Sequence, residues 1–280
     1  MKKRVLITGT SGMLGSVLAK DWSNEYQLTT VYDRRQFNFA QGNYAKLFKR
    51  TKPEIIVHCA ALTNLEYCEN NPEEALSVNG ESVGKLVNVM PQAKMIFISS
   101  ETVFPPNTKN AKEDTPINPK TIYGESKKLG EELLLQADGG TVIRTTIVGR
   151  NINKPGNSLT EWIVNSLKHK SPITLFDDVW FTPISIWHLS EALTWVIENQ
   201  TPRVLHIAGG ERVTKYQFGY ELAKFLGLPT NLIRKGKLAD LGLAVKRSNE
   251  MSLDSSLYEK LSGKELPKLI EVIKMIASSY

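Results

Sequence analysis

The sequence predicts an α/β protein with a doubly wound parallel sheet and a smaller C-terminal lobe. Two observations favour the sheet. Short apolar runs alternate with helical segments up to residue 150, a pattern typical of a parallel sheet buried between two layers of helices. A glycine-rich turn also follows the first apolar run directly. Beyond Gly149 the alternation weakens, which predicts the separate lobe.

The first strand, turn and helix form a motif suited to a phosphate group. The apolar run 5–7 enters a turn with Gly9, Gly12 and Gly15, and the helix-compatible residues 13–19 follow. Glycine lets a ligand approach the backbone where a Cβ would collide, and it lets the helix pack closely on the strand. The N–H groups and dipole of the helix start would face a pyrophosphate. We therefore expect a dinucleotide site, with an ordinary glycine-rich turn as the alternative.

The second strand, 27–32, ends at charged residues that affect the choice of cofactor. Asp33 lies where a dinucleotide fold places the carboxylate that holds the adenosine ribose, about 20 residues past the glycines. Arg34 and Arg35 follow and could pair with a 2′-phosphate. NADH and NADPH therefore both remain open. A solvated turn charge is the alternative for Asp33.

The middle of the chain continues the alternation. Its expected elements are a strand over 55–61, a helix over 71–90, a strand over 94–99, a helix over 122–137 and a strand over 141–146. Asn71 and Pro72 mark the start of the first of these helices. Ser99 and Ser100 end the middle strand, at the edge of a parallel sheet where ligands bind. His58, within the first strand, is expected to be a packed core residue.

The C-terminal part has elements that divide between two bodies. They are helices over 157–168, 186–198, 215–226 and 268–278, and strands over 173–176 and 203–207. The segment from about 185 to 207 can return to the first domain. We therefore expect a dinucleotide-binding domain of residues 1–150 plus about 185–207, and a substrate lobe of residues 151–184 and 208–280.

Composition and charge exclude several classes of protein. The 280 residues are 41% hydrophobic, enough for a sizeable core. The net charge of +6 comes from interspersed Lys, Arg, Asp and Glu, which favours an anionic small ligand over nucleic acid. Cys59 and Cys68 have no Cys or His partner at metal spacing, so we expect reduced thiols. No catalytic metal is expected.

Targeting and membrane segments are not expected either. The basic start, residues 1–4, is followed by only three apolar residues before Thr8, too few for a signal peptide. No run approaches the roughly 18 apolar residues of a membrane span. The expected location is the cytoplasm.

Tyr123 and Lys127 form the candidate proton-transfer pair. Their spacing of four residues places them on one face of the predicted helix. A nearby ammonium favours the ionised phenol, so we expect the pKa of Tyr123 to be lowered into a useful range. The Ser100 hydroxyl would hydrogen-bond the same carbonyl oxygen. Tyr220 and Lys224 share this spacing, but no glycine turn or serine-bearing strand leads to them, so we treat them as a chance match.

Several segments together carry a resemblance to a known family. They are 8–15 (TGTSGMLG), 59–63 (CAALT), 78–79 (VN), 98–104 (ISSETVF), 119–127 (PKTIYGESK) and 144–145 (RT), with weaker matches at 181–183 (FTP) and 247–254. These segments resemble the extended short-chain dehydrogenases/reductases, and among them the dTDP-4-dehydrorhamnose reductase family. The resemblance implies a Rossmann-type fold, a nicotinamide cofactor (NADP or NAD), a nucleotide-sugar substrate, and Ser100, Tyr123 and Lys127 as catalytic residues.

The same resemblance assigns residues to two sites. Cofactor contacts are expected from Gly9, Ser11, Gly12, Met13, Leu14, Gly15, Asp33, Arg34, Asn38, Phe39, Ala60, Ala61, Leu62, Tyr123 and Lys127. Substrate contacts are expected from Ser100, Glu101, Thr102, Tyr123, Thr146, Ile147 and Arg247. Glu101-Thr102 stands where the family usually has Asp-Tyr, and Thr146-Ile147 stands where it tends to have Ser-Trp. The identity of the sugar is therefore open.

Three functions fit these residues. The first is an NAD(P)H-dependent reductase of a nucleotide-linked 4-keto-6-deoxy sugar, with hydride from the nicotinamide and a proton from Tyr123. A nucleotide-sugar 4-epimerase would use the same residues but hold NAD tightly. The regulatory beta subunit of methionine adenosyltransferase resembles the same family and binds NADP while serving a partner enzyme. A 4,6-dehydratase is disfavoured because Thr102 stands where those enzymes have glutamate. A homodimer is also left open.

Overall fold

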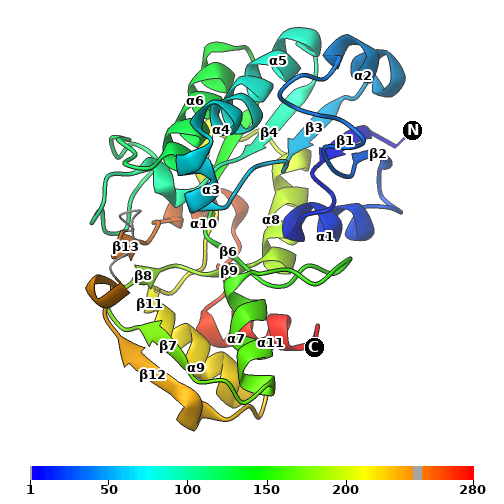
Figure 1. Ribbon diagram of the computed structural model, residues 1–280. Helices are drawn as coiled ribbons and strands as arrows, with labels where there is room; N and C mark the ends of the chain where they lie inside the picture. Colours follow the sequence, from blue (N-terminus) through cyan, green and yellow to red (C-terminus); the bar gives the residue numbers. More distant parts are fainter. Residues whose placement is uncertain (1, 242–247) are drawn as a thin grey trace.

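A parallel sheet of six strands forms the centre of the protein in the computed structural model, which describes residues 2–241 and 248–280. In spatial order the strands are β10 (Val204–His206), β5 (Thr141–Arg144), β4 (Lys94–Ile98), β3 (Ile55–His58), β1 (Arg4–Thr8) and β2 (Gln27–Val31). Every neighbouring pair is parallel. The expected doubly wound sheet is therefore confirmed (Figure 1).

The strand order reverses beside β1. The chain passes from β1 to β2 on one side, where Val5 is opposite Leu28, and then crosses to β3 on the other side, where Val5 is opposite Ile55. In open parallel sheets a ligand binds at such a reversal, beyond the carboxyl ends of the strands. The glycine turn that follows β1 lies at this point.

The side chains of each strand alternate between two apolar layers. Val5 and Ile7 belong to one core cluster and Leu6 to another, which is the period of two expected of a strand. The first layer holds α1 (Met13–Asp21) and α8 (Ile186–Glu198), and the second holds α2 (Tyr44–Thr51), α5 (Ser82–Val89) and α6 (Ile122–Gln136). Because both faces are covered, the strands are apolar along most of their length.

Among the short helices that were not expected from the sequence are α2 and α3 (Leu65–Asn70). Each begins after an asparagine whose side-chain oxygen accepts a hydrogen bond from the first turn. Asn43 accepts from the Lys46 backbone N–H, and Asn64 accepts from the Tyr67 backbone N–H, both at 2.9 Å. Asparagine is among the favoured N-cap residues, so these caps are the sequence signal that identifies both helices.

The long helix expected to begin at Asn71 contains an irregular turn. It consists of α4 (Pro72–Leu76), a π-helical turn (Ser77–Glu81) and α5. The π turn carries the buried Asn79, whose amide donates to the Ser126 hydroxyl on α6 at 2.9 Å. Single π turns within α-helices occur frequently at functional sites. Here the turn ties this helix to the helix that bears Tyr123.

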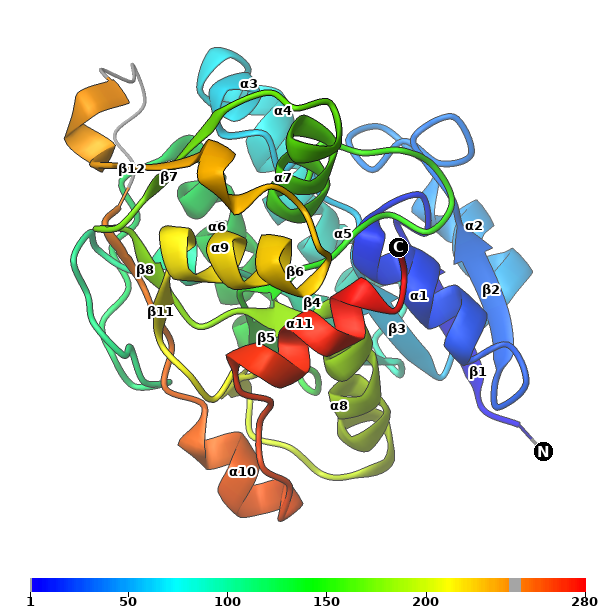
Figure 2. The same ribbon diagram turned by 90° about the horizontal axis from the view of Figure 1, so that it is seen from below.

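The smaller lobe has an apolar core of its own. Its elements are α7 (Leu159–Lys168), β7 (Ile173–Phe176), α9 (Lys215–Phe225), β12 (Ile233–Gly236) and α11 (Leu269–Ala277). Strands β7 and β12 pair in parallel, and α9 contacts both α7 and α11 (Figure 2). Ile163, Phe218 and Ile273 are among the fully buried side chains that fill the space between these helices and strands.

Short strands connect the two parts of the chain. β6 (Ile147–Val148) pairs with β9 (Ile184–Ser185), and β8 (Trp180–Phe181) pairs with β11 (Val213–Thr214) and β13 (Glu250–Met251). Three single turns of 3-10 helix cover Glu101–Val103, Thr230–Leu232 and Leu238–Leu241. The β6–β9 pair lies between the main sheet and the smaller lobe, whereas β8, β11 and β13 form a separate small sheet.

Segments from the second half of the chain also pack on the main sheet. α8 lies against α1, and β10 is an edge strand of the sheet. α10 (Ser256–Ser262) contacts β10 and buries Tyr258 in the core cluster beside α1. Part of the segment 208–280 therefore contacts the first domain. Within residues 2–241 and 248–280, no helix is long and apolar enough to cross a membrane.

Candidate active site

The glycine turn leaves room for a diphosphate. Gly12 caps α1 without a side-chain hydrogen bond, so the first N–H groups of this helix keep no side-chain partner at the cap. A Cβ on Gly15 would lie 2.5 Å from the Gly9 carbonyl oxygen, so only glycine lets α1 approach the turn this closely. The turn itself is fixed to the end of β2, because Thr10 donates to the Val31 carbonyl at 3.1 Å. This geometry fits a dinucleotide.

Replacing Gly15 with alanine is expected to weaken cofactor binding by about tenfold or more, because the added Cβ pushes α1 away from the turn. Titration of the purified variant with NADPH and with NADH, followed by fluorescence, measures the Kd. Gly84→Ala on α5 is the control, since its Cβ would meet only the flexible Leu133 side chain, at 3.2 Å. A folded Gly15→Ala protein with an unchanged Kd would contradict this assignment.

Asp33 lies beyond the end of β2, where a ribose would be held. Its carboxylate accepts from the Arg35 guanidinium at 2.8 and 3.0 Å, and these bonds lower the pKa of Asp33. Arg34 is mostly exposed, with its guanidinium 3.8 Å from the Glu74 carboxylate. A carboxylate that suits a ribose and arginines that suit a 2′-phosphate thus stand side by side. The choice between NADH and NADPH stays open.

The other residues assigned to the cofactor lie along the same edge. Ala60, Ala61 and Leu62 follow β3, and the Ala60 N–H donates to the Thr8 hydroxyl at 3.2 Å. The Asn79 side chain accepts from the Leu62 N–H at 2.7 Å and donates to its carbonyl at 2.9 Å, so it shapes this stretch. Asn38 makes a turn by accepting from the Ala40 N–H. The side chain of Phe39 is buried against Tyr44 and His58.

Ser100 and Tyr123 are brought together by close packing of two backbones. Ser100 follows β4 and caps the 3-10 turn, and Tyr123 is the second residue of α6. A Cβ on Gly124 would lie 2.5 Å from the Thr102 carbonyl oxygen, so this glycine lets the start of α6 touch the turn. Ser100 lies close enough to the Tyr123 phenol to lower its pKa. The expected serine and tyrosine therefore share one site.

Lys127 lies one helical turn farther along α6 and is 2% exposed. Its ammonium is 4.3 Å from the centre of the Phe97 ring. Burial lowers the pKa of Lys127 to about 8, while the Glu131 carboxylate and the Cys59 thiol oppose this shift. The lysine is therefore a charge held at the edge of the sheet, next to the residues that follow β3.

The expectation of a lowered pKa for Tyr123 is wrong. Burial raises the pKa of this phenol, the Glu101 carboxylate raises it further, and the nearby Ser100 only partly opposes both. The ammonium of Lys127 does not offset the loss of solvation. Sequence spacing shows that a lysine is near, but it does not show how deeply the phenol is buried. Tyr123 therefore carries its proton at neutral pH.

A buried ion pair below the site was missed by the sequence reasoning. Glu131 and Arg144 are 0% and 3% exposed, with Oε2 and Nη2 2.8 Å apart. The Ser99 hydroxyl donates to Glu131 at 2.5 Å, and Arg144 also donates to the Glu113 carbonyl. This pair joins the ends of β4 and β5 to α6. A charged residue four positions after Lys127, on the same helix face, was the available signal.

A cavity of about 670 Å³ separates this edge from the smaller lobe. Glu101 and Thr102, two of the predicted substrate contacts, line this cavity. The lobe contributes residues that were not predicted, among them Leu159, Trp162, Phe176, Lys215 and Met251. The hydroxyl oxygen of Thr102 is buried and has no hydrogen-bond partner among the described residues. An unpaired polar group beside a cavity is suited to a polar ligand.

Four of the expected substrate contacts are not part of the lining of this cavity, namely Ser100, Tyr123, Thr146 and Ile147. The Thr146 hydroxyl donates instead to the Thr182 carbonyl, which fixes it between the two parts of the chain. Ile147 lies in β6 and pairs with Ile184 of β9. Neither Thr146 nor Ile147 lines the cavity. Arg247 lies outside the described residues.

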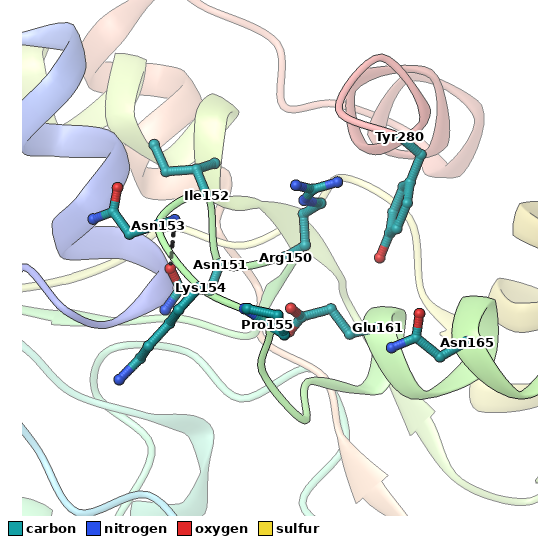
Figure 3. A pocket seen from close by; sticks show the side chains of 9 residues that line it. All are labelled: Arg150, Asn151, Ile152, Asn153, Lys154, Pro155, Glu161, Asn165 and Tyr280. Atoms are coloured by element: carbon teal, nitrogen blue, oxygen red, sulfur yellow. Dashed lines mark hydrogen bonds between the residues drawn. The ribbon is translucent and has the colours of Figure 1, made fainter.

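A second cavity, of about 360 Å³, is lined by the loop 150–155 together with Glu161, Asn165 and Tyr280 (Figure 3). The loop that forms its wall is attached to the turn, because the Asn151 amide donates to the Ser11 carbonyl at 2.6 Å. Arg150 donates to the Ser279 carbonyl and lies over the Tyr280 ring.

In the part of the chain that the structure describes, no group of three or more His, Cys, Asp or Glu residues could hold a metal ion.

The fold and the site together define a class of protein. A parallel sheet with a glycine turn at its reversal, and with a serine, a tyrosine and a lysine at its carboxyl edge, is that of an extended short-chain dehydrogenase/reductase. The more specific assignment comes from the family model. The chain belongs to the RmlD substrate binding domain family, whose model matches residues 2–280.

Individual relatives agree with this assignment. The spore coat polysaccharide biosynthesis protein SpsK of Bacillus subtilis (strain 168) is 28% identical over 82% of each chain. The methionine adenosyltransferase 2 subunit beta of Bos taurus is 26% identical over 95% of this chain and 84% of its own. The dTDP-4-dehydrorhamnose reductase of Bacillus anthracis str. Ames, solved in complex with NADP, has a TM-score of 0.92 over 100% of both chains. At 22% identity this last likeness is one of fold.

Proposed function

We propose that the protein is an NAD(P)H-dependent reductase of a nucleotide-linked 4-keto-6-deoxy sugar. The observation that carries this proposal is the meeting of Ser100, Tyr123 and Lys127 at the edge of the sheet, next to a cavity lined by Glu101 and Thr102. The family assignment supports it, as does the similarity in fold to the B. anthracis protein, a dTDP-4-dehydrorhamnose reductase.

Each of the three residues has a role in this proposal. A bound nicotinamide would supply the hydride, with the glycine turn and Lys127 among the groups that hold the cofactor. Tyr123 carries its proton at neutral pH, so it donates that proton to the alkoxide oxygen formed on the sugar. Ser100 hydrogen-bonds the same oxygen and orients it. Lys127, charged beside the ribose, balances the negative charge that develops on the phenol.

The smaller lobe, residues 151–184 and 208–280, would bind the nucleotide sugar. Trp162 and Phe176 give the cavity flat apolar walls that suit a base or a sugar face. Lys120 and Lys215 also line it, and cations there favour the diphosphate. Thr102 offers its unpaired hydroxyl to the sugar.

A nucleotide-sugar substrate and the free thiols of the described cysteines support a cytoplasmic location.

The test is to mix the purified protein with NADH or NADPH and a panel of nucleotide-linked 4-keto-6-deoxy sugars, and to follow nicotinamide absorbance. Oxidation of the cofactor with one sugar, and a matching 4-hydroxy product, would support the reductase. Cofactor binding without oxidation by any member of the panel would contradict it. Tightly held NAD in the purified protein would favour the 4-epimerase instead.

A regulatory role is the second candidate, and one observation favours it. The methionine adenosyltransferase 2 subunit beta matches nearly the whole chain at an identity close to that of SpsK. A regulatory subunit would bind the cofactor yet change only the activity of a partner enzyme. The sugar panel separates the two, because a regulatory subunit would give no oxidation.

Light scattering of the purified protein would test whether it forms a homodimer.

A further inference from the structure

The proton of the Ser100 hydroxyl is already engaged. Ser100 Oγ donates to Glu101 Oε2 at 2.7 Å, and the same oxygen accepts from the Thr102 backbone N–H at 3.3 Å. The Tyr123 phenol lies beside this side chain. A hydroxyl has one proton to donate. While Glu101 is ionised, Ser100 therefore has no proton left for the carbonyl oxygen of a substrate.

We propose that Glu101 is a positioning residue that acts through Ser100, and that the site is competent for reduction when Glu101 is protonated. The inference rests on the proposed function. A protonated Glu101 donates to Ser100 Oγ, and Ser100 turns its own proton toward the substrate oxygen. Each group keeps one proton in this arrangement, and the proton that ends on the product still comes from Tyr123.

The surroundings of Glu101 favour its protonated form. The carboxyl lines the cavity on the 3-10 turn between β4 and α6, and burial raises its pKa. The hydrogen bond from Ser100 and the charge of Lys215, at the start of α9, oppose this shift. From α6 the facing titratable group is Tyr123, whose pKa is itself raised by Glu101. The raised pKa moves the titration of Glu101 toward neutral pH.

Besides Glu101 and Lys215, two further charged residues among those described line the cavity, Lys120 and Glu250. Lys120 lies on the loop before α6 and also lines the cavity. Glu250, on β13, is paired with the Arg212 guanidinium and accepts from the Ser252 hydroxyl at 2.6 Å. Of the two carboxylates that line the cavity in the described residues, Glu101 alone bonds to Ser100. Glu250 is therefore a matched control.

A first experiment needs no substrate. The protein is labelled with ¹³C at the glutamate side-chain carboxyls, the Glu101 signal is assigned by its loss in Glu101→Gln, and its pH titration is recorded. Glu101 is expected to titrate above the ordinary range of glutamate, about 4.3. Ser100→Ala is expected to raise the pKa further, because it removes a bond that stabilises the ionised form. An unchanged pKa in Ser100→Ala would overturn the proposal.

A second experiment uses turnover of the sugar identified from the panel. In the wild-type protein, kcat/KM should fall about tenfold per pH unit above the pKa of Glu101, because the ionised form is inactive. Glu101→Gln should lose this fall, since its amide can donate to Ser100 at any pH, and Glu250→Gln should keep it. A second change in kcat/KM near pH 8, from the titration of Lys127, should remain in the wild-type protein, in Glu101→Gln and in Glu250→Gln.

Persistence of the same fall in Glu101→Gln would overturn the proposal, even if the ligand-free titration behaves as expected. If no sugar is reduced by the wild-type protein, the proposed function fails by itself. The carboxyl titration still decides whether Ser100 and Glu101 are coupled. Melting temperatures of Glu101→Gln and Ser100→Ala show whether either change acts by unfolding the protein.

Discussion

Replacing Tyr123 with phenylalanine is expected to lower kcat for reduction of the 4-keto sugar by about 1000-fold, or about 4 kcal/mol in the barrier. The variant keeps the aromatic ring but loses the only proton that Tyr123 can give to the alkoxide. Because burial keeps the phenol protonated, the wild-type protein has this proton available at neutral pH. The measurement is steady-state oxidation of NAD(P)H with the sugar identified from the panel.

The matched control is Tyr220→Phe. Tyr220 and Lys224 repeat the four-residue spacing on α9, but the Tyr220 ring stacks on Tyr216 and belongs to the core of the smaller lobe. We expect its kcat to stay within about twofold of the wild-type value, and both variants to bind NADPH with unchanged Kd. A Tyr123→Phe protein that retains full kcat would show that another group supplies the proton.

Much of the fold could be predicted because the main sheet is covered on both faces. Its strands are then continuous apolar runs, as in Ile55–His58 and Lys94–Ile98, and such runs are visible in the sequence. The short strands of the smaller lobe could not be found in this way. β8 and β9 have two residues each, too few to show a period, and their pairing depends on segments far apart in the chain.

The candidate site was predictable to the extent that its residues are local in sequence. Tyr123 and Lys127 lie on one helix, and Ser100 ends a strand that the apolar pattern reveals. The cavity wall was not predictable, because Trp162 and Lys215 reach it only through the packing of the smaller lobe. Protonation states were not predictable either, since they depend on burial, which is a tertiary property.

The hydrogen bond from Ser100 to Glu101 shows the same limit. Adjacent residues in an extended chain point to opposite sides, so the sequence gives no reason to join their side chains. The 3-10 turn over Glu101–Val103 curls the chain back and makes the contact. The turn in turn depends on Gly124, which admits α6 against the Thr102 carbonyl. The contact at Ser100 thus depends on how α6 packs against this turn, which the four-residue spacing of Tyr123 and Lys127 does not show.

Lowering the pH from 7 to 5 is expected to reduce the free energy of unfolding by about 4 kcal/mol through two buried histidines. His58 and His206 are both 0% exposed. Burial lowers the pKa of His58 to about 3 and that of His206 to about 4, and the charges of Lys127 and Arg144 respectively act in the same direction. Both imidazoles are therefore neutral in the folded protein over this range.

The sign follows from proton uptake. In the unfolded chain both histidines titrate near 6.5, so below that pH the unfolded state binds protons that the folded state does not. The contribution of the two histidines to stability is therefore fully present above about pH 6.5, their pKa in the unfolded chain. It is lost as the pH falls toward their lower pKa values in the folded protein. Each histidine contributes about 1.4 kcal/mol per pH unit in this window. Against a typical stability of about 5–15 kcal/mol, the combined loss is large.

Urea unfolding at pH 7, 6 and 5 measures this loss directly. His58→Gln and His206→Gln should each remove about half of the pH dependence, because glutamine does not titrate, although each will also lower stability at pH 7. The Thr8 and Ser82 side chains, which hydrogen-bond the two ring nitrogens of His58, lose ideal partners in the first variant. The exposed His169 serves as the control, and His169→Gln should leave the slope unchanged. If His58→Gln and His206→Gln both keep the wild-type dependence of the unfolding free energy on pH, these imidazoles are not the groups that titrate.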